Sequence, residues 1–190
     1  MRVGLFFGSF NPIHIGHLII ANTLAQSEEV DQVWFVVSPQ NPFKKSNSLA
    51  HEFDRLDMVR AAIHDNFLLQ VSDIEFSMPR PSYTVDTLAY LSEKHPDHQF
   101  FIMMGEDNLV NFPRWKNHEA ILNDYGLIVY PRPKAKASEI KNHPNVRMVE
   151  APKIDISATF IRSQLEAGRS VRYLVPDPVE EIISSRKIYQ

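Results

Sequence analysis

The sequence of 190 residues contains no cysteine and only six glycines, and it has no apolar run long enough to cross a membrane. Without cysteine, a disulfide framework, a thiolate zinc site and a cysteine nucleophile are all excluded. A membrane-spanning helix is excluded because it needs about 18 or more consecutive apolar residues. The formal net charge of −3 provides no bulk attraction for nucleic acid, so any anionic ligand must be bound by a local site.

The remaining composition is that of an ordinary globular protein, with 44% hydrophobic and 23% charged residues. A chain of this length is expected to form one domain over residues 1–190, large enough to bury a substantial core. Its first residues enter a strand-like stretch at 3–7 without the cleavage pattern of a signal peptide, which predicts a cytoplasmic location. The sequence leaves the oligomeric state open.

Apolar segments alternate along the chain with segments of helical periodicity. Two of them, 33–37 and 100–104, are continuous apolar runs, which are typical of parallel strands covered on both faces. The pattern predicts an α/β fold with a doubly wound, mostly parallel, Rossmann-like sheet, helices on both faces and a small helical C-terminal part at 155–190. The expected strands are 3–7, 32–37, 68–74, 99–104, 126–130 and 146–149, and the expected helices are 15–27, 53–64, 84–95 and two that begin near Ser157 and at 176–178.

Ligands of such folds bind beyond the carboxyl ends of the strands, so the loop after the first expected strand is the first candidate site. Gly8 lets the backbone approach a ligand closely. The backbone N–H groups of Gly8, Ser9 and Phe10, together with the N-terminus of the following helix, can cradle a phosphate. The spacing fits neither the Walker loop nor the G-x-G-x-x-G dinucleotide motif.

The same loop carries two histidines, His14 and His17, which share one face if the first helical turn includes both. Gly16 between them removes a side chain where a substrate could lie against the helix. Two imidazoles beside a helix N-terminus form a donor cluster suited to the charge on phosphate oxygens, and we expect a phosphate site here. Two alternatives stay open: the histidines could only cap and solvate the helix start, or they could ligate a metal, for which the sequence offers no obvious third ligand nearby.

Two more segments have the chemistry to bind a nucleotide. Gly105 and Asp107 follow a buried strand, at a position where proteins of this fold commonly bind a ribose or a metal. Asp107 could instead simply cap a helix. Ser157 is a good N-cap, and Thr159 and Arg162 lie near the same helix end, a combination that suits a polyphosphate. An ordinary capped helix with a surface arginine also explains this last segment.

The segments around Thr84 and Trp115 are less specific by themselves. Ser82 or Thr84 can be the N-cap of the third expected helix, and Asp86 suits its first turn. Trp115 lies on a loop among polar residues, where an indole can either stack on a flat heterocycle or anchor the loop in the core.

The order His14-Ile15-Gly16-His17 after the first strand resembles the His-x-Gly-His signature of a nucleotidyltransferase superfamily, in which it binds ATP or CTP phosphates and stabilises the transition state. Three further motifs narrow the resemblance: Ser-Tyr-Thr-x-Asp-Thr-Leu at 82–88, Gly-Glu-Asp at 105–107 and Pro-x-Trp at 113–115. With these motifs nearly the whole chain resembles the bacterial nicotinate-nucleotide adenylyltransferases, including the segments 39–45, 132–133 and 156–162.

The resemblance implies a role for each of these segments. Thr84 and Trp115 would lie at the nicotinate-nucleotide pocket, with Trp115 stacked on the pyridine ring, and Gly105 and Asp107 would face the nucleotide. The catalytic residues would be His14 and His17, and the ATP phosphates would be held by Gly8, Ser9, Phe10, Lys44, Ser157, Thr159 and Arg162.

The chain departs from the family pattern at three positions. Phe43 stands where relatives commonly have a histidine, which leaves Lys44 as the expected phosphate contact. Ala158 replaces the second serine of an Ile-Ser-Ser motif, and Lys116 stands where many relatives have tyrosine. None of these changes removes the signature.

The implied reaction is transfer of the adenylyl group of ATP to nicotinate mononucleotide, which gives nicotinate adenine dinucleotide (deamido-NAD) and pyrophosphate, with Mg²⁺ accompanying ATP. The expected partners are these small molecules, with no nucleic acid and no membrane. Two alternatives remain: another acceptor on the same scaffold, such as phosphopantetheine, or a non-catalytic nucleotide sensor.

Overall fold

The computed structural model describes residues 1–39, 49–133 and 135–190. These residues form a six-stranded sheet in the order β3-β2-β1-β4-β5-β6, and every pair of neighbouring strands is parallel. The predicted Rossmann-like architecture is therefore confirmed, since this is the strand order of two halves that wind away from a central strand. The strands are β1 (Arg2–Gly8), β2 (Gln32–Val37), β3 (Leu69–Ser72), β4 (Gln99–Gly105), β5 (Leu127–Tyr130) and β6 (Val146–Met148).

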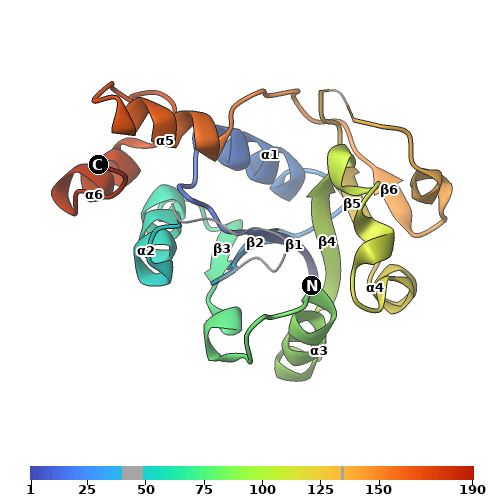
Figure 1. Cartoon of the computed structure of the whole chain (residues 1–190). Coiled ribbons are helices and arrows are strands. Elements are labelled where there is room, and N and C mark those ends of the chain that lie inside the picture. The colour runs from blue at the N-terminus through green and yellow to red at the C-terminus, as the bar shows by residue number, and fades with distance from the viewer. Residues whose placement is uncertain (40–48, 134) are drawn as a thin grey trace.

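Helices cover both faces of the sheet, and Figure 1 shows α1 and α5 on one side and α3 on the other. One core lies between the sheet and α1, α2, α5 and α6, and the second lies between the sheet and α3 and α4. Successive strand residues alternate between them, so that Phe6 belongs to the first core and Leu5 to the second. The helices are α1 (Ile15–Ala25), α2 (Glu52–Ile63), α3 (Thr84–Lys94), α4 (His118–Asp124), α5 (Ala158–Glu166) and α6 (Asp177–Ser185).

The chain changes its direction across the sheet at β1. From β1 the sheet continues through β2 and β3 on one side and through β4, β5 and β6 on the other. Phe6 of β1 lies beside Met103 of β4, so the carboxyl ends of these two strands, Gly8 and Gly105, open on the same edge. The crevice at such a point is where open α/β sheets bind their ligands.

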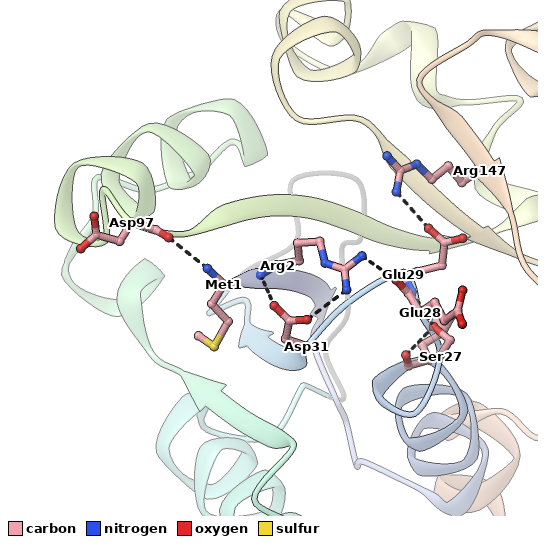
Figure 2. Close-up of polar contacts among 9 residues, drawn as sticks. Met1, Arg2, Ser27, Glu28, Glu29, Asp31, Asp97 and Arg147 are labelled. Carbon is pink, nitrogen blue, oxygen red and sulfur yellow. Dashed lines mark hydrogen bonds and ion pairs between the residues drawn. The ribbon is translucent and has the colours of Figure 1, made fainter.

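The opposite edge of the sheet, where β1 begins, is held by polar contacts (Figure 2). The Asp31 carboxylate accepts hydrogen bonds from the Arg2 amide at 2.7 Å and from the Arg2 guanidinium at 3.1 Å. The same guanidinium donates to the Glu28 carbonyl, and Arg147 pairs with Glu29 at 3.0 Å. These charges are exposed, and exposed pairs contribute little to stability, so they serve mainly to order the strand end.

The structure confirms the expected strands and helices, with ends that differ by at most two residues. The third strand stops at Ser72, because Ile74 opens a short 3₁₀ helix (Ile74–Ser77) and its amide donates to the Ser72 hydroxyl at 3.4 Å. Helix α4 was not expected, since it is only seven residues long and buries just Ile121 and Leu122. None of the helices in the described parts of the chain combines the length and the apolar character that a membrane crossing requires.

Candidate active site

The first loop leaves β1 at Gly8, and the ring of Phe10 folds back over this strand end. A Cβ atom on Gly8 would lie only 2.7 Å from that ring, so the packing requires glycine. Phe10 is 2% exposed and has a φ of +43°, which is uncommon for a residue other than glycine. The side chain of Phe10 therefore anchors the loop in the core, and its predicted contact with a phosphate has to come from the backbone.

His14 is the N-cap of α1, and its ring stacks on that of His17 with the ring centroids 3.7 Å apart. The first helical turn thus brings the two histidines together, as predicted. A Cβ atom on Gly16 would lie 3.0 Å from His14 Nδ1 and 3.5 Å from the Ile154 side chain. The expectation that Gly16 leaves space for a substrate is therefore wrong, because the His14 ring and Ile154 occupy that space.

The burial of His14 determines its charge. His14 is 5% exposed, and in the described part of the chain its buried Nδ1 has no hydrogen-bond partner. Burial, assisted by the positive charge of Arg132, lowers the pKa of His14 to about 4. At pH 7 this imidazole is neutral and carries a single N–H donor.

His17 makes a different contact with the same helix start. Its Nδ1 accepts a hydrogen bond from the His14 amide at 3.3 Å. An accepting Nδ1 places the proton of the neutral ring on Nε2, which makes Nε2–H its donor. This contact from the third helical residue back to the N-cap amide is half of a capping box, so His17 takes part in capping the helix start.

The N-terminus of α1 is partly closed by the chain itself. The Ile15 amide, the first of the helix, donates to the Leu174 carbonyl at 2.9 Å. A helix start leaves about four amides without a partner inside the helix, and this one is already satisfied. The predicted phosphate cradle therefore does not extend to the Ile15 amide.

The second strand end carries Gly105, Asp107 and a residue with no role in the sequence-based interpretation, Arg132. A Cβ atom on Gly105 would lie 2.5 Å from Asp107 Oδ1 and 2.8 Å from Arg132 Cγ, so the glycine lets these two side chains cross the strand end. Arg132 Nε lies 3.8 Å from Asp107 Oδ1. Gly105 is the N-cap of the 3₁₀ helix Glu106–Asn108, so the idea that Asp107 caps a helix is wrong.

Ile154 connects the two strand ends. Its carbonyl accepts a hydrogen bond from Arg132 Nη1 at 3.1 Å, while its side chain reaches the position beside Gly16. Arg132 follows the end of β5, and a basic residue directly after a buried strand is the signal that could have identified it.

The start of α5 also reaches the first loop. Ser157 is the N-cap, as predicted, and its hydroxyl accepts from the Phe160 amide at 3.2 Å. Arg162 Nη1 donates to the Asn11 carbonyl at 2.8 Å, and Nη2 lies 3.5 Å from the Thr159 hydroxyl. Residues some 150 positions apart in sequence therefore meet at the same edge of the sheet.

Thr84 is the first residue of α3, and the N-cap is Tyr83 without a side-chain cap, so the prediction of Ser82 or Thr84 as N-cap is wrong. The reason is Glu75, a carboxylate 2% exposed, which accepts hydrogen bonds from the hydroxyls of Ser82 and Thr87, each at 2.9 Å. Two hydroxyls of this segment thus satisfy a buried carboxylate instead of the helix end. Asp86 does lie in the first turn, as expected.

Trp115 is half-buried, and its ring centroid lies 5.4 Å from that of Phe112, so the indole is anchored at the edge of the second core. The next residue, Lys116, pairs with Asp86 at 2.8 Å and lies 4.7 Å from the centroid of the Tyr83 ring. These contacts bring the Trp115 loop against the first turn of α3. A pocket of about 460 Å³ opens beside this junction, and Tyr83, Asp86 and Lys116 line it.

Two further sequence predictions are not placed by the structure. Lys44 and Phe43 lie outside the described residues. Among the residues that are described, no group of three or more histidine, aspartate or glutamate side chains could hold a metal ion.

The stacked histidine pair thus lies at the switch point of a parallel sheet, beside a second strand end and the capped start of α5. The family model described as cytidylyltransferase-like matches residues 5–164. The chain is 61% identical to a Cytophaga hutchinsonii protein named "Probable nicotinate-nucleotide adenylyltransferase", over all of this chain and 98% of the relative. It is 45% identical to a Flavobacterium johnsoniae protein of the same name over the full length of both. The chain therefore belongs to the cytidylyltransferase-like family and, within it, to the nicotinate-nucleotide adenylyltransferases.

Solved structures agree on the fold. The chain resembles Plasmodium falciparum nicotinic acid mononucleotide adenylyltransferase complexed with NaAD, with a TM-score of 0.82 and 19% identity over 99% of this chain and 97% of that one. The same Plasmodium protein complexed with APC gives a TM-score of 0.81 at 20% identity, over 99% and 96% of the two chains.

Proposed function

We propose that this protein transfers the adenylyl group of ATP to nicotinate mononucleotide and releases nicotinate adenine dinucleotide and pyrophosphate, a step of NAD biosynthesis. The observation that carries the proposal is the stacked His14–His17 pair at the switch point, in a chain whose curated relatives are named for this reaction. We also propose that the reaction takes place in the cytoplasm. We also propose that residues 1–190 act as one domain, because α5 and α6 share a core with the sheet.

In the proposed reaction the phosphate of the mononucleotide attacks the α-phosphorus of ATP in line, and pyrophosphate leaves. The attacking phosphate is already ionised at neutral pH, so the protein need not supply a general base. Its contribution is to hold the mononucleotide phosphate and the ATP triphosphate in the orientation for attack, and to neutralise the negative charge that develops on them.

We assign the charge-neutralising groups from their geometry. The Nε2–H of His17 and the single N–H of neutral His14 would donate to phosphate oxygens, together with backbone amides of residues 8–10. Arg132 adds a permanent positive charge at the neighbouring strand end. An anion beside His14 favours the protonated imidazole, so substrate binding itself raises the pKa of His14 again and strengthens the contact.

The remaining predicted contacts belong to the ATP side. Ser157, Thr159 and Arg162 would hold the triphosphate, as would Lys44, and Gly105 and Asp107 would face the nucleotide. Support for the role of the three α5 residues comes from the hydrogen bond between Arg162 and the Asn11 carbonyl, which holds the start of α5 against the first loop.

We propose that Mg²⁺ enters with ATP as part of the substrate. Magnesium prefers oxygen ligands and usually keeps several waters, with the rest supplied by a few carboxylates and by substrate phosphates. In the part of the chain that the structure describes, no group of three or more acidic or histidine side chains could hold a metal ion, and we propose that phosphate oxygens and water supply most of its ligands.

On the acceptor side, Thr84 and Trp115 would bind the nicotinate moiety, with the indole stacked on the pyridine ring. The contact between Trp115 and Phe112 holds the indole in a defined orientation. Lys116 provides a cation near the same place, and nicotinate differs from nicotinamide by its carboxylate. We therefore expect a higher kcat/KM for nicotinate mononucleotide than for nicotinamide mononucleotide, and equal values for the two would contradict this assignment.

One assay separates the candidate functions: pyrophosphate release from MgATP with nicotinate mononucleotide, with phosphopantetheine, or with no acceptor. Release that depends on nicotinate mononucleotide, and formation of nicotinate adenine dinucleotide, is the expected result. Release with phosphopantetheine alone would instead identify the other acceptor. Binding of ATP without release under any condition would identify a nucleotide sensor.

A further inference from the structure

The guanidinium of Arg55, on α2, is fully buried beneath the first loop. Its Nη1 donates to the carbonyls of Ser9 at 2.6 Å and Ser38 at 2.7 Å, and its Nη2 donates to the Pro39 carbonyl at 2.9 Å. Its Nε donates to the Ala50 carbonyl at 2.9 Å. One side chain therefore ties the loop after β1 to the loop after β2.

The partners of this cation are unusual. Within the described residues, all the hydrogen-bond acceptors of Arg55 are backbone carbonyls, and none is a carboxylate. Burying a cation without a paired anion is costly, and burial lowers the pKa of Arg55. A residue needed only to fill the core would be apolar at this position, so the hydrogen bonds to the loops are the reason for an arginine here.

A second anchor holds the next residues of the same loop. Asn11 is 5% exposed, and its Oδ1 accepts from the Tyr189 hydroxyl at 2.6 Å and from the Ala50 amide at 3.0 Å. Ala50 thus contacts Asn11 through its amide and Arg55 through its carbonyl, which joins the two anchors into one network. Burial raises the pKa of the Tyr189 hydroxyl, so this group remains a donor over the whole neutral range.

We propose that Arg55 and Tyr189 are positioning residues, which hold the first loop in the geometry that its backbone amides and His14 need for contact with substrate phosphates. Neither residue touches the reacting atoms; each acts through Ser9 or Asn11. A shift of about 1 Å in a group that contacts the reacting phosphates can cost about a hundredfold in rate. The kinetic test rests on the proposed function, whereas a test of loop order does not.

The sharpest variant is Tyr189→Phe in the full chain, because it removes one hydroxyl and keeps the ring. We expect kcat to fall about fivefold to tenfold, as the loss of one hydrogen bond predicts, while KM for ATP and for nicotinate mononucleotide changes less than twofold. Tyr173→Phe is the matched control, since Tyr173 is 80% exposed, and it should keep the wild-type kcat. A Tyr189→Phe enzyme with unchanged kcat would overturn the proposal, because Tyr189 and Arg55 hold the loop through one network that meets at Ala50.

Arg55→Lys and Arg55→Met distinguish geometry from charge. Lysine keeps the positive charge but cannot reproduce the planar set of donors that reaches four carbonyls. If Arg55 positions the loop, both variants should lose about a hundredfold in kcat. Recovery of full activity by Arg55→Lys would show that only the charge matters and would overturn the positioning role. Because Arg55 is fully buried and these variants can fail to fold, the Tyr189 result decides the proposal by itself.

Amide hydrogen exchange of peptides that cover residues 9–17 provides a readout independent of the reaction. Exchange in this segment should be at least about fivefold faster in Tyr189→Phe than in the wild type or in Tyr173→Phe, because an unanchored loop opens more often. Unchanged exchange would contradict the proposal even if activity fell. If the wild-type protein fails to turn over nicotinate mononucleotide, the proposed function is refuted, and the exchange experiment still tests the anchors.

Discussion

His14 is buried, neutral and stacked on a second imidazole, and these three properties have one structural origin. The missing side chain of Gly16 admits the ring into the space between α1 and Ile154, where water cannot reach Nδ1. Burial then lowers the pKa of His14, and the nearby Arg132 guanidinium acts in the same direction. The site therefore places the positive charge of Arg132 and the hydrogen-bond donors of the two imidazoles where an anion is expected.

Replacing His17 by alanine should reduce kcat about a hundredfold. The loss of one preorganised donor to a developing charge costs on the order of 3 kcal/mol in the barrier. Pyrophosphate release under saturating MgATP and nicotinate mononucleotide measures the effect. Because His17 Nδ1 also accepts from the His14 amide, the stability of the variant must be measured in parallel. Turnover near the wild-type rate would remove His17 from the catalytic assignment.

The lowered pKa of His14 also predicts how stability depends on pH. Between pH 6.5 and about 4 the unfolded chain binds a proton at His14 that the folded chain does not, so stability falls as the pH is lowered. Between pH 7 and pH 5 the expected loss is about 2 kcal/mol in the free energy of unfolding from this residue alone.

Urea denaturation of the wild type and of His14→Asn at pH 7 and pH 5, in buffers without phosphate, isolates this contribution. Asparagine does not titrate and is a good N-cap, so the variant should lose less stability than the wild type on acidification. Equal losses would mean that His14 does not carry the effect.

At the scale of elements, the first turn of α3 is held by Glu75 of the preceding 3₁₀ helix. The carboxylate accepts one hydrogen bond from the hydroxyl of Ser82, which precedes the helix, and one from the hydroxyl of Thr87, which lies within it. These contacts set where Thr84 begins α3, and the pair between Asp86 and Lys116 sets where the Trp115 loop meets it. The proposed nicotinate pocket therefore depends on three separate segments of the chain: the 3₁₀ helix with Glu75, the first turn of α3 and the Trp115 loop.

Glu75→Ala should lower the free energy of unfolding by about 1–3 kcal/mol, because it removes the acceptor of the buried Ser82 hydroxyl and leaves the Thr87 hydroxyl only the Tyr83 carbonyl at 3.3 Å. It should also raise KM for nicotinate mononucleotide more than KM for ATP, since the first turn of α3 loses its anchor. Glu75→Gln is the matched control, because an amide of the same shape can still accept from one hydroxyl and donate to the other. A uniform loss of activity without a change in the ratio of the two KM values would show that Glu75 is only structural.

At the scale of the whole molecule, the helices of the C-terminal part pack into the same core as the sheet. Ile161, Val179 and Ile183 are all fully buried and belong to the same core as α1 and α2. Arg186 also pairs with Asp54 and Asp57 on α2. Figure 1 shows α6 beside α2, far in sequence but adjacent in space.

Removing residues 155–190 should therefore prevent folding. The deletion exposes the apolar surface that these three side chains cover, and burial of one such side chain contributes about 1.5–3 kcal/mol. Circular dichroism during thermal unfolding should show no cooperative transition in the shortened chain. A cooperative transition near that of the full chain would show that residues 1–154 form a separate domain.

Sequence patterns predicted most of the elements because buried parallel strands and amphipathic helices have strong periodic signals. Helix α4 lacked such a signal, since only Ile121 and Leu122 of its seven residues are buried. Arg132 entered the sequence analysis only within a segment of the resemblance; its position after a buried strand is a local signal, but its effect on His14 depends on a contact between distant segments. The space beside Gly16 was misinterpreted for the same reason: a sequence does not show which atoms fill the place of a missing side chain.

By itself, the sequence determined the order of the six strands and of the helices other than α4, the family resemblance and the loop in which the two histidines lie, because each depends on residues that are close together along the chain. The tertiary structure alone decided what those residues meet. The carbonyls that surround Arg55, the hydroxyl of Tyr189 on Asn11 and the carboxylate of Glu75 beneath α3 all come from distant segments. Hydrogen bonds and burial depend on distances in space. Distant segments come within these distances only after the strands have formed the sheet and their carboxyl ends lie at one edge.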